Sequence, residues 1–344
     1  MRRKSGSRVT LADVAERSGM SKSAVSMILN NKPGSRLSAE AIERVRAAAS
    51  ELDYRPNPVA QSLRSGKTRA IGLISDQVTI TRYATNMIVG ALNATREHRH
   101  TVFMAETGSE PDALGEAISA MLDRRVDGIA VALMGARMVD VPEVPTDTPL
   151  VIINGTTSDD HPSILPDEAG AGRAVAQSIL DAGHRHIGVL GELDATITVD
   201  PRRTVTIGSR FRAINETLAA AGVEPACAPM ELWSPPTGYE TTLRLMAERP
   251  GLTALIAAND NVAFGIYQAL TELGLRIPED VSVISFDDEE VAAYHRPGLT
   301  TARLPYEEMG RLGAEMLLGA QELRHAVLPM PLIWRGSVRD LSAN

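Results

Sequence analysis

Near the amino end, apolar residues recur at helical spacing in short runs that are bounded by capping residues. Leu11 and Val14 share one face of the first run, as positions three apart do on a helix. Thr10 precedes the run and Asp13 follows it by three residues, which is the spacing of a capping box. Gly19 stands where a left-handed residue can end a helix. The pattern predicts a short capped helix that ends at Gly19.

Two further helices are predicted after this glycine. Ser21 can cap the second helix, and its apolar residues Val25, Ile28 and Leu29 share one face. Its other face carries Lys22, Ser23, Ser26, Met27 and Asn30. The third helix begins at Ser38 and has the apolar residues Ile42, Val45, Ala49 and Leu52. Two short helices joined by a tight turn are typical of a helix-turn-helix unit, whose second helix enters the DNA major groove. A helical hairpin of a small bundle is the alternative interpretation.

From Ala70 onward, short apolar runs alternate with amphipathic stretches. The first part predicts strands at 70–75, 101–105, 128–133 and 149–154, with helices at 83–97 and 112–123. The second part predicts helices at 168–182, 209–221, 238–248 and 262–273, with strands at 186–190, near Glu231, at 253–258 and at 281–286. The last part predicts a strand at 299–304, a helix at 306–318 and a strand near 332–334. Such alternation indicates parallel sheets with helices on both faces.

The predicted fold class is therefore a small all-α head followed by an α/β body of two doubly wound parallel-sheet lobes. The first lobe is expected to take about 70–165 and 299–327, and the second about 166–298 and 328–340. Ligands of such sheets bind beyond the carboxyl ends of the strands.

Charge separates the head from the body. Residues 1–69 hold fourteen basic and six acidic side chains, a net charge of +8, whereas the remainder carries −16, which together give −8. A basic head on an acidic body fits a DNA-binding module attached to a domain that does not bind DNA. The acidic body repels phosphate and confines DNA contact to the head.

Three further features of the sequence concern the cellular compartment in which the protein works. Cys227 is the single cysteine, so no internal disulfide is expected, as in a reducing cytosol. Residues 1–4 are basic, but no apolar run follows them, so they are interpreted as a basic arm and not as a signal peptide. No apolar stretch approaches the ~20 residues of a membrane helix. A cytoplasmic protein is expected.

Two linked stretches carry a specific resemblance. VTLADVAERSGMSKSAVSMILN, followed by YRPNPVAQSLRSGKT, closely resembles the headpiece and hinge of the LacI/GalR family of bacterial transcription regulators. The resemblance implies a DNA-binding head at 1–56, a hinge helix and linker at 57–69, and an effector-binding and dimerisation body at 70–344. It implies a periplasmic-binding-protein-like body of type I. The expected function is a repressor that binds a palindromic operator as a homodimer and is controlled by a small molecule.

The same resemblance assigns roles within the head. It implies that Lys22, Ser23 and Met27 read bases, and that Thr10, Ser21, Ser26 and Asn30 contact the DNA backbone. Met27 departs from the family pattern, where arginine is common and can grip a guanine edge with two hydrogen bonds. An altered operator is therefore expected at the corresponding base pair. The loop at 31–37 is also expected to be longer than usual.

The hinge forms a third part of the resemblance. Asn57 can cap a helix and Pro58 suits its first position, but a helix of about two turns is marginal in water. The resemblance implies that Leu63 wedges into the minor groove at the centre of the operator, where an apolar side chain bends the duplex. A Pro-rich linker whose Leu63 packs on the body is the alternative.

Two stretches of the body resemble the family's effector-binding motifs. They are AANDNVAFGIYQALTELGLRIPEDVSVISFDD, with Ser285 where glycine is usual, and SRFRAINETLAAAGV, with Ala213 where glycine is usual. The effector-binding residues implied are Asp287, Arg210, Asn259, Trp233, Asn154 and Tyr83. Carboxylate, amide and guanidinium groups can pair with neighbouring hydroxyls, and an indole offers a flat face. A sugar or sugar derivative is expected, and a nucleobase or nucleoside stays open.

Structural roles are the alternatives for these residues. Asn259 and Asp287 could cap helices, Arg210 could form a surface ion pair, and Trp233 could be a partly exposed core residue. No catalytic residues, metal ligands or cofactors are expected. Gly170-Ala171-Gly172 lacks the third glycine of a dinucleotide fingerprint, and the histidines at 98, 100, 184 and 186 lack a metal-ligand framework.

Two other classes of protein are alternatives to a regulator. A solute-binding receptor without a regulatory role is disfavoured by the basic head, and a sugar isomerase or kinase by the lack of a phosphate loop and of an acid-base pair. No leucine-heptad tail follows Arg335, so a dimer is expected and not a tetramer built on such a tail.

Overall fold

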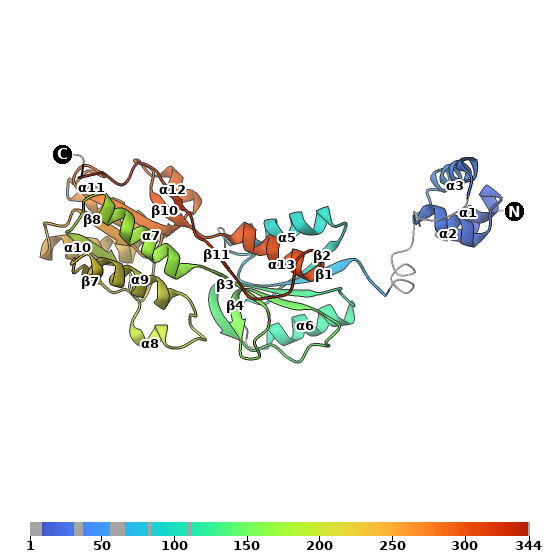
Figure 1. Cartoon of the computed structure of the whole chain (residues 1–344), viewed down its shortest axis with the longest axis horizontal. Helices are drawn as coiled ribbons and strands as arrows, with labels where there is room; N and C mark the ends of the chain where they lie inside the picture. Colours follow the sequence, from blue (N-terminus) through green and yellow to red (C-terminus); the bar gives the residue numbers. More distant parts are fainter. Residues whose placement is uncertain are drawn as a thin grey trace. The chain divides into compact units, whose positions relative to one another are not determined.

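The computed structural model describes residues 9–30, 37–55, 66–81, 84–108, 110 and 112–342. The chain divides into two units, Met1–Thr68 and Arg69–Asn344, which are called the head and the body and are drawn in Figure 1. Within the described part of the chain, no helix has the length and apolarity needed to span a membrane.

The head contains the helices α1 (Leu11–Ser18), α2 (Lys22–Leu29) and α3 (Ala39–Glu51). The capping box expected at the start of α1 forms, since Thr10 and Asp13 exchange hydrogen bonds. Gly19 ends α1 with a φ of 68°, in the left-handed region that favours glycine. Val14, Val25 and Val45, one from each helix, are fully buried at its centre. The three helices therefore close a small core of their own.

The described strands of the body form two sheets, sheet A and sheet B. Sheet A has the order β11-β5-β4-β3-β1-β2, and its pairs are parallel. Its strands are β1 (Ala70–Asp76), β2 (Thr101–Glu106), β3 (Ile129–Val139), β4 (Leu150–Thr157), β5 (Ser163–Pro166) and β11 (Ala326–Leu328). Sheet B has the order β12-β10-β9-β8-β6-β7 and is parallel except for the pair β10–β12. Its strands are β6 (Ile187–Leu190), β7 (Ala226–Ala228), β8 (Ala254–Ala257), β9 (Ser282–Asp287), β10 (Thr300–Arg303) and β12 (Leu332–Ile333).

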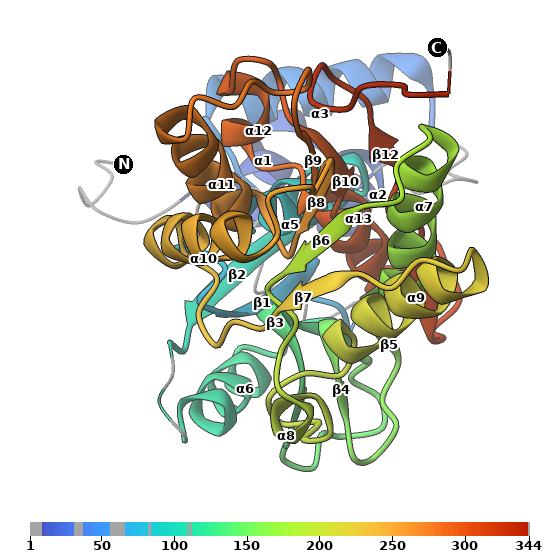
Figure 2. The same ribbon diagram turned by 90° about the vertical axis from the view of Figure 1, so that its left-hand side faces the viewer.

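Helices cover both faces of each sheet. On sheet A, α5 (Thr85–Glu97) and α13 (Tyr306–Leu317) pack on one face and α6 (Ala113–Asp123) on the other. On sheet B, α7 (Glu168–Asp181) and α9 (Ile207–Ala220) lie on one side, and α10 (Pro235–Glu248) and α11 (Asp260–Glu272) on the other, as Figure 2 shows. Short helices α8 (Ala195–Thr198) and α12 (Glu290–Tyr294) follow β6 and β9. The predicted fold class of an α head and a two-lobed α/β body is confirmed.

The structure also corrects some predicted elements. The expected first-lobe segment began at 299, but β10 pairs with β9, so residues 300–303 belong to sheet B. The chain passes between the sheets after β5, after β10 and after β11. The strand expected near Glu231 lies instead at β7, and β3 continues beyond the predicted end to Val139. Strands β5 and β11 are too short to show an alternating pattern in the sequence.

Candidate functional site

The α2 helix presents a polar face to solvent. Ser21 caps it, with its Oγ accepting from the Ala24 N–H at 3.2 Å. Lys22 and Ser23 are exposed and Met27 is half-buried. Val25 and Ile28 lie buried on the opposite side, and they fix which side of α2 faces outward. The structure thus brings the three predicted base-reading residues onto one helix.

The residues expected to contact the DNA backbone surround this helix. Thr10 is exposed at the start of α1, and Ser26 and Asn30 are half-buried. Asn30 donates from Nδ2 to the Ser26 carbonyl oxygen at 2.5 Å, which places both side chains at the carboxyl end of α2. Leu63, the predicted minor-groove residue, lies outside the described residues.

A cavity of about 460 Å³ opens between the two lobes, beyond the carboxyl ends of their strands. Five of the six predicted effector-binding residues line it: Arg210, Asp287, Asn259, Trp233 and Asn154. Tyr83 lies outside the described residues. Cavities at this position of a doubly wound sheet are the usual ligand sites.

Arg210 is the central cation of this cavity. Its side chain is only 1% exposed, and its Nε and Nη2 donate to the two carboxylate oxygens of Glu168 at 2.6 and 2.8 Å. Its Nη1 donates to the Ala258 carbonyl oxygen at 2.5 Å. Burial lowers the pKa of Arg210, but the charge and hydrogen bonds of Glu168 outweigh burial and raise it. The alternative of a surface ion pair is wrong, because the pair is buried.

Asp287 ends β9 beside this cation. Its Oδ1 lies 3.8 Å from Nη2 of Arg210, and its side chain is 10% exposed. Burial raises the pKa of Asp287 to about 7 against the opposing effect of Arg210, and the neighbouring carboxylates of Asp260 and Glu168 raise it further. Asp287 is a strand residue and does not cap α12, whose N-cap is Glu289. A carboxyl group with this pKa can accept or donate a hydrogen bond to a ligand hydroxyl near neutral pH.

Asn259 and Trp233 have structural partners as well as a place in the cavity wall. Asn259 caps α11, because its Oδ1 accepts from the Val262 N–H at 2.9 Å. The indole Nε1 of Trp233 donates to the Gly191 carbonyl oxygen at 2.7 Å. Phe211 meets the indole edge-on at 6.1 Å between ring centroids. These contacts fix the orientation of the indole and leave it half-buried at the cavity.

Asn154 is held by the backbone of the neighbouring strand. Its Nδ2 donates to the carbonyl oxygens of Leu133 and Met134 at 3.0 and 2.9 Å. Its φ of 60° is left-handed, a conformation that asparagine tolerates better than most residues. The predicted strand ended at Asn154, but β4 continues to Thr157. Both contacts hold Asn154 inside β4, where its pairing with β3 shifts register, on the first-lobe side of the cavity.

Sequence reasoning missed Glu168, which it placed only at the start of a helix. The close packing of α7 against α9 brings this residue to Arg210. A Cβ added to Gly172 would lie 2.4 Å from the Arg210 carbonyl oxygen, so only glycine permits the approach. The two glycines at 170 and 172 therefore serve helix capping and the packing of α7 on α9. The only local signal that could have pointed to Glu168 as a site residue was a charged side chain in the first turn of a buried helix.

The two departures from the family motifs also have local explanations. Ser285 is fully buried and its hydroxyl donates to Asp260. The same carboxylate accepts from the Thr301 hydroxyl at 2.9 Å and from the Glu289 N–H at 2.7 Å. Ala213 is 3% exposed and faces Gly172 across the contact between α7 and α9. Ser285 thus belongs to a buried hydrogen-bond network around Asp260, and Ala213 to the contact between α7 and α9.

Residues 199–206, called the strap, connect the lobes beside the cavity. The Pro201 carbonyl oxygen accepts from the Met138 N–H at 2.7 Å, and the Val205 N–H donates to the Ala136 carbonyl oxygen at 2.8 Å. Arg202 pairs with Asp140 at 2.6 Å. The strap leaves the second lobe and bonds to the end of β3, so it ties the lobes together at one side of the cavity.

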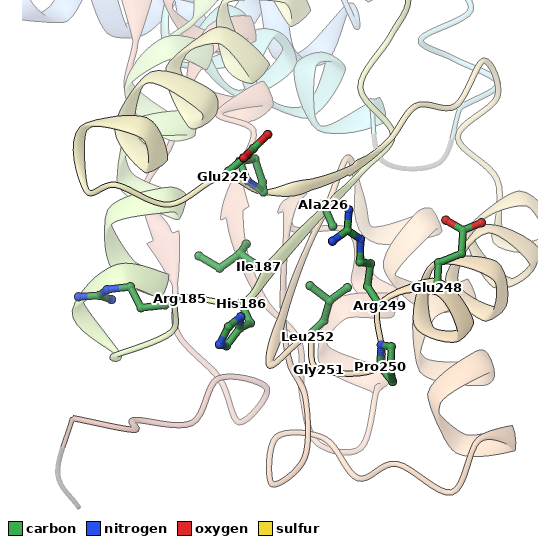
Figure 3. Close-up of a pocket in the computed structure, with 11 residues that line it drawn as sticks. Arg185, His186, Ile187, Glu224, Ala226, Glu248, Arg249, Pro250, Gly251 and Leu252 are labelled. Atoms are coloured by element: carbon green, nitrogen blue, oxygen red, sulfur yellow. The ribbon is translucent and has the colours of Figure 1, made fainter.

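A second hollow of about 410 Å³ lies at the other end of sheet B. It surrounds the amino ends of β6 and β8 and includes Arg185, His186 and Arg249 (Figure 3). Arg185 donates to the carbonyl oxygens of Leu180 and His184. His184 is buried against Thr253 and the Arg339 carbonyl oxygen, and burial lowers its pKa. These contacts give Arg185 and His184 a structural role.

Comparisons with known proteins agree on one family. Residues 10–57 match the model for bacterial regulatory proteins of the lacI family, and residues 176–338 match the periplasmic binding protein-like domain. The ribose operon repressor of Haemophilus influenzae is 30% identical over 347 residues, which cover 96% of this chain and 99% of the relative. The lactose operon repressor of Escherichia coli K12 is 29% identical over 336 residues, and the match covers 95% of this chain and 90% of the relative.

Solved structures show the same similarity. The lac repressor dimer bound to operator and the anti-inducer ONPF superposes with a TM-score of 0.76 at 27% identity, and the match covers 97% of this chain and all (100%) of that one. The lac repressor bound to ONPG in a repressed state also has a TM-score of 0.76, at 26% identity over 96% of this chain and 100% of the other. The similarity therefore extends over both the head and the body.

Proposed function

The chain belongs to the lacI family of bacterial regulatory proteins, and we propose that it is a repressor whose hold on a palindromic operator is set by a small molecule in the interlobe cavity. It is a transcription regulator and not an enzyme, like the relatives it resembles over nearly its whole length. The observation that carries this proposal is that one chain combines two features. The polar face of α2 is turned outward from the buried core of the three head helices, and the body contains a cavity of a size that suits a small ligand.

Each part of the head has a distinct task. Lys22, Ser23 and Met27 read base edges in the major groove, because they stand on the outward face of α2. Thr10, Ser21, Ser26 and Asn30 contact the DNA backbone, where short hydroxyl and amide groups fix register without reading sequence. Leu63 wedges into the minor groove at the operator centre. A protein with these tasks works where the chromosome is, in the cytoplasm.

The body supplies a surface for a second copy of the chain. Strand β2 is an edge strand of sheet A, and it exposes Phe103 and Met104 by 41% and 42%. Val89 on the neighbouring α5 is 43% exposed. Apolar side chains on the edge of a sheet favour association, and a two-fold dimer has two heads, one for each half of a palindrome.

The cavity accounts for control by an effector. Arg210, Asp287 and Asn259 offer hydrogen-bonding groups around the half-buried face of Trp233, which suits a sugar or sugar derivative, with a nucleobase or nucleoside also open. A ligand that prefers one arrangement of the lobes shifts the equilibrium between them and so changes DNA affinity. The names of the relatives, a ribose operon repressor and a lactose operon repressor, support the sugar class.

Selection of DNA sequences on the purified full-length chain tests this function. The expected result is a palindromic consensus, lost in a Lys22→Ala/Ser23→Ala variant that keeps the buried core of the head. The amount of DNA that the protein retains should fall steeply as the salt concentration rises, because contacts to phosphates release counterions. A lack of any consensus at low salt, with and without sugars and nucleosides, would instead favour a solute-binding receptor without a regulatory role.

A further inference from the structure

We propose that the effector of this protein is uncharged, because Glu168 is a built-in counter-ion that occupies the anion-binding side of Arg210 and excludes carboxylated and phosphorylated ligands. This inference rests on the proposed function and narrows the effector class from sugars and derivatives to those without an acid group. Glu168 then determines specificity, and Arg210 contacts the ligand.

The geometry of the ion pair supports this role. Glu168 uses both carboxylate oxygens on Arg210 in a bidentate pair, and its side chain is only 3% exposed. With Ala258 as a third acceptor, three of the five guanidinium N–H groups are engaged. Within the part of the chain that the structure describes, the other two N–H groups have no protein acceptor and can serve a ligand, but the positive charge is already neutralised. A hydroxyl or carbonyl oxygen can use these donors without bringing a charge.

The packing of α7 keeps Glu168 in this position. Glu168 stands one turn before Gly172 on the same helix, and Gly172 lies against the backbone of Arg210. An anionic ligand that displaced Glu168 would leave a carboxylate buried without its partner, which costs far more than a surface ion pair gains. Since α7 cannot move away without opening the contact with α9, displacement is disfavoured.

The other charges of the cavity act in the same direction. The charged residues in its lining are Glu168, Arg203, Arg210, Glu231 and Asp287. Arg203 and Glu231 are exposed at its rim and offset one another. The buried set of Arg210, Glu168 and Asp287 carries a charge between zero and minus one, depending on the proton of Asp287. A phosphate or carboxylate would add negative charge to a buried site whose described lining offers no second buried cation to receive it.

Ligand titrations on the full-length protein test this proposal. The probes are a neutral panel of pentoses, hexoses and nucleosides, and an anionic panel of inorganic phosphate, ribose 5-phosphate and gluconate. They are applied to the wild type, to Glu168→Gln and to Glu231→Gln, with binding measured by thermal shift and calorimetry. Both variants remove one negative charge from the cavity lining, but only Glu168→Gln frees the guanidinium of Arg210.

The expected result is no saturable response of the wild type or of Glu231→Gln to the anionic panel. Glu168→Gln should bind at least one anion about tenfold or more tightly than the wild type does. Saturable binding of an anion by the wild type, lost in Arg210→Lys, would overturn the proposal. So would equal behaviour of all three proteins towards the anions. If Glu168→Gln does not fold, as judged by circular dichroism, the wild-type titration with the anions decides alone.

A different measurement tests the proposed regulatory function. Operator selection reports on the head, and it can succeed whether or not the cavity rejects anions. A wild type that binds neutral probes but selects no operator would contradict the proposed regulatory function, and the proposal of an uncharged ligand would still hold. A wild type that selects an operator and releases it when a sugar phosphate is added would contradict only the proposal of an uncharged effector.

Discussion

Gly172 on α7 touches the backbone of Arg210 on α9, so closely that a Cβ at position 172 would lie 2.4 Å from the Arg210 carbonyl oxygen. This contact sets the distance between the two helices and, with it, the bidentate pair between Glu168 and Arg210. The buried ion pair in the wall of the interlobe cavity therefore depends on the absence of a side chain at one position.

Gly172→Ala should destabilise the body by about 1–3 kcal/mol, the usual range for overpacking a closely packed contact. Helix propensity alone would favour alanine by about 1 kcal/mol, so the sign of the change reports which effect dominates. Gly115→Ala is the matched control, because Gly115 lies in α6 with no atom within 4 Å of an added Cβ. Urea unfolding of both variants measures the difference, and an equally stable Gly172→Ala would contradict the contact.

Three partly or fully buried carboxyl groups should each contribute less to the stability of the body as pH rises towards neutrality. Burial raises the pKa of Asp287 from 3.8 to about 7, and burial also raises those of Asp260 and Glu289 to about 7. Between about pH 4 and about pH 7 these groups then bind more protons in the folded state than in the unfolded chain, so their contribution to the free energy of unfolding decreases with pH. The positive charge of Arg210 opposes this shift at Asp287.

Asp287→Asn removes one of these protons and should flatten the dependence. The variant is expected to gain stability relative to the wild type as pH rises from about 5 to about 8. Thermal unfolding across this range provides the measurement, with Asp112→Asn on the exposed start of α6 as the control. Parallel curves for the wild type and Asp287→Asn would show that Asp287 ionises in the folded body as it does in the unfolded chain.

Local signals in the sequence are enough to predict the head. Thr10 with Asp13 and Gly19 mark the ends of α1 by interactions within one turn. The ends of buried strands are also local signals. Asn259 and Asp287 stand at the ends of two apolar runs that become neighbouring strands of sheet B, so their carboxyl ends meet at one edge. Asn154 lies in sheet A, and only the family resemblance grouped it with them.

Other features depend on contacts between distant segments. Glu168 meets Arg210 across 42 positions of sequence, and only the packing at Gly172 brings them together. The sheet that β10 joins is set by its pairing with β9, which its apolar residues alone do not specify. The strap bonds to β3 through backbone groups, which leave no pattern in the side chains.

Met104→Asp should weaken the homodimer by placing a charge on the exposed edge of sheet A. Met104 lies on β2, 42% exposed, and a two-fold interface would bring two such charges together. Val327→Asp is the matched control, since Val327 is 63% exposed on β11, the opposite edge strand of the same sheet. Sedimentation should show a shift towards monomer for Met104→Asp but not for Val327→Asp, and Met104→Asp should also bind operator more weakly. If Met104→Asp stays dimeric and Val327→Asp becomes monomeric, the dimer interface lies at the β11 edge instead.

Met27→Arg should change the operator that the protein selects without affecting the fold of the head. Met27 is half-buried on the outward side of α2, where its thioether cannot form the paired hydrogen bonds that arginine makes to guanine O6 and N7. One such pair contributes about 1–3 kcal/mol of discrimination between bases, so the variant should enrich guanine at one position of each half-site. Ser50→Arg adds the same guanidinium and the same positive charge at an exposed position near the carboxyl end of α3, so it controls for a general gain in affinity. An identical consensus for the wild type and Met27→Arg would mean that position 27 does not face a base.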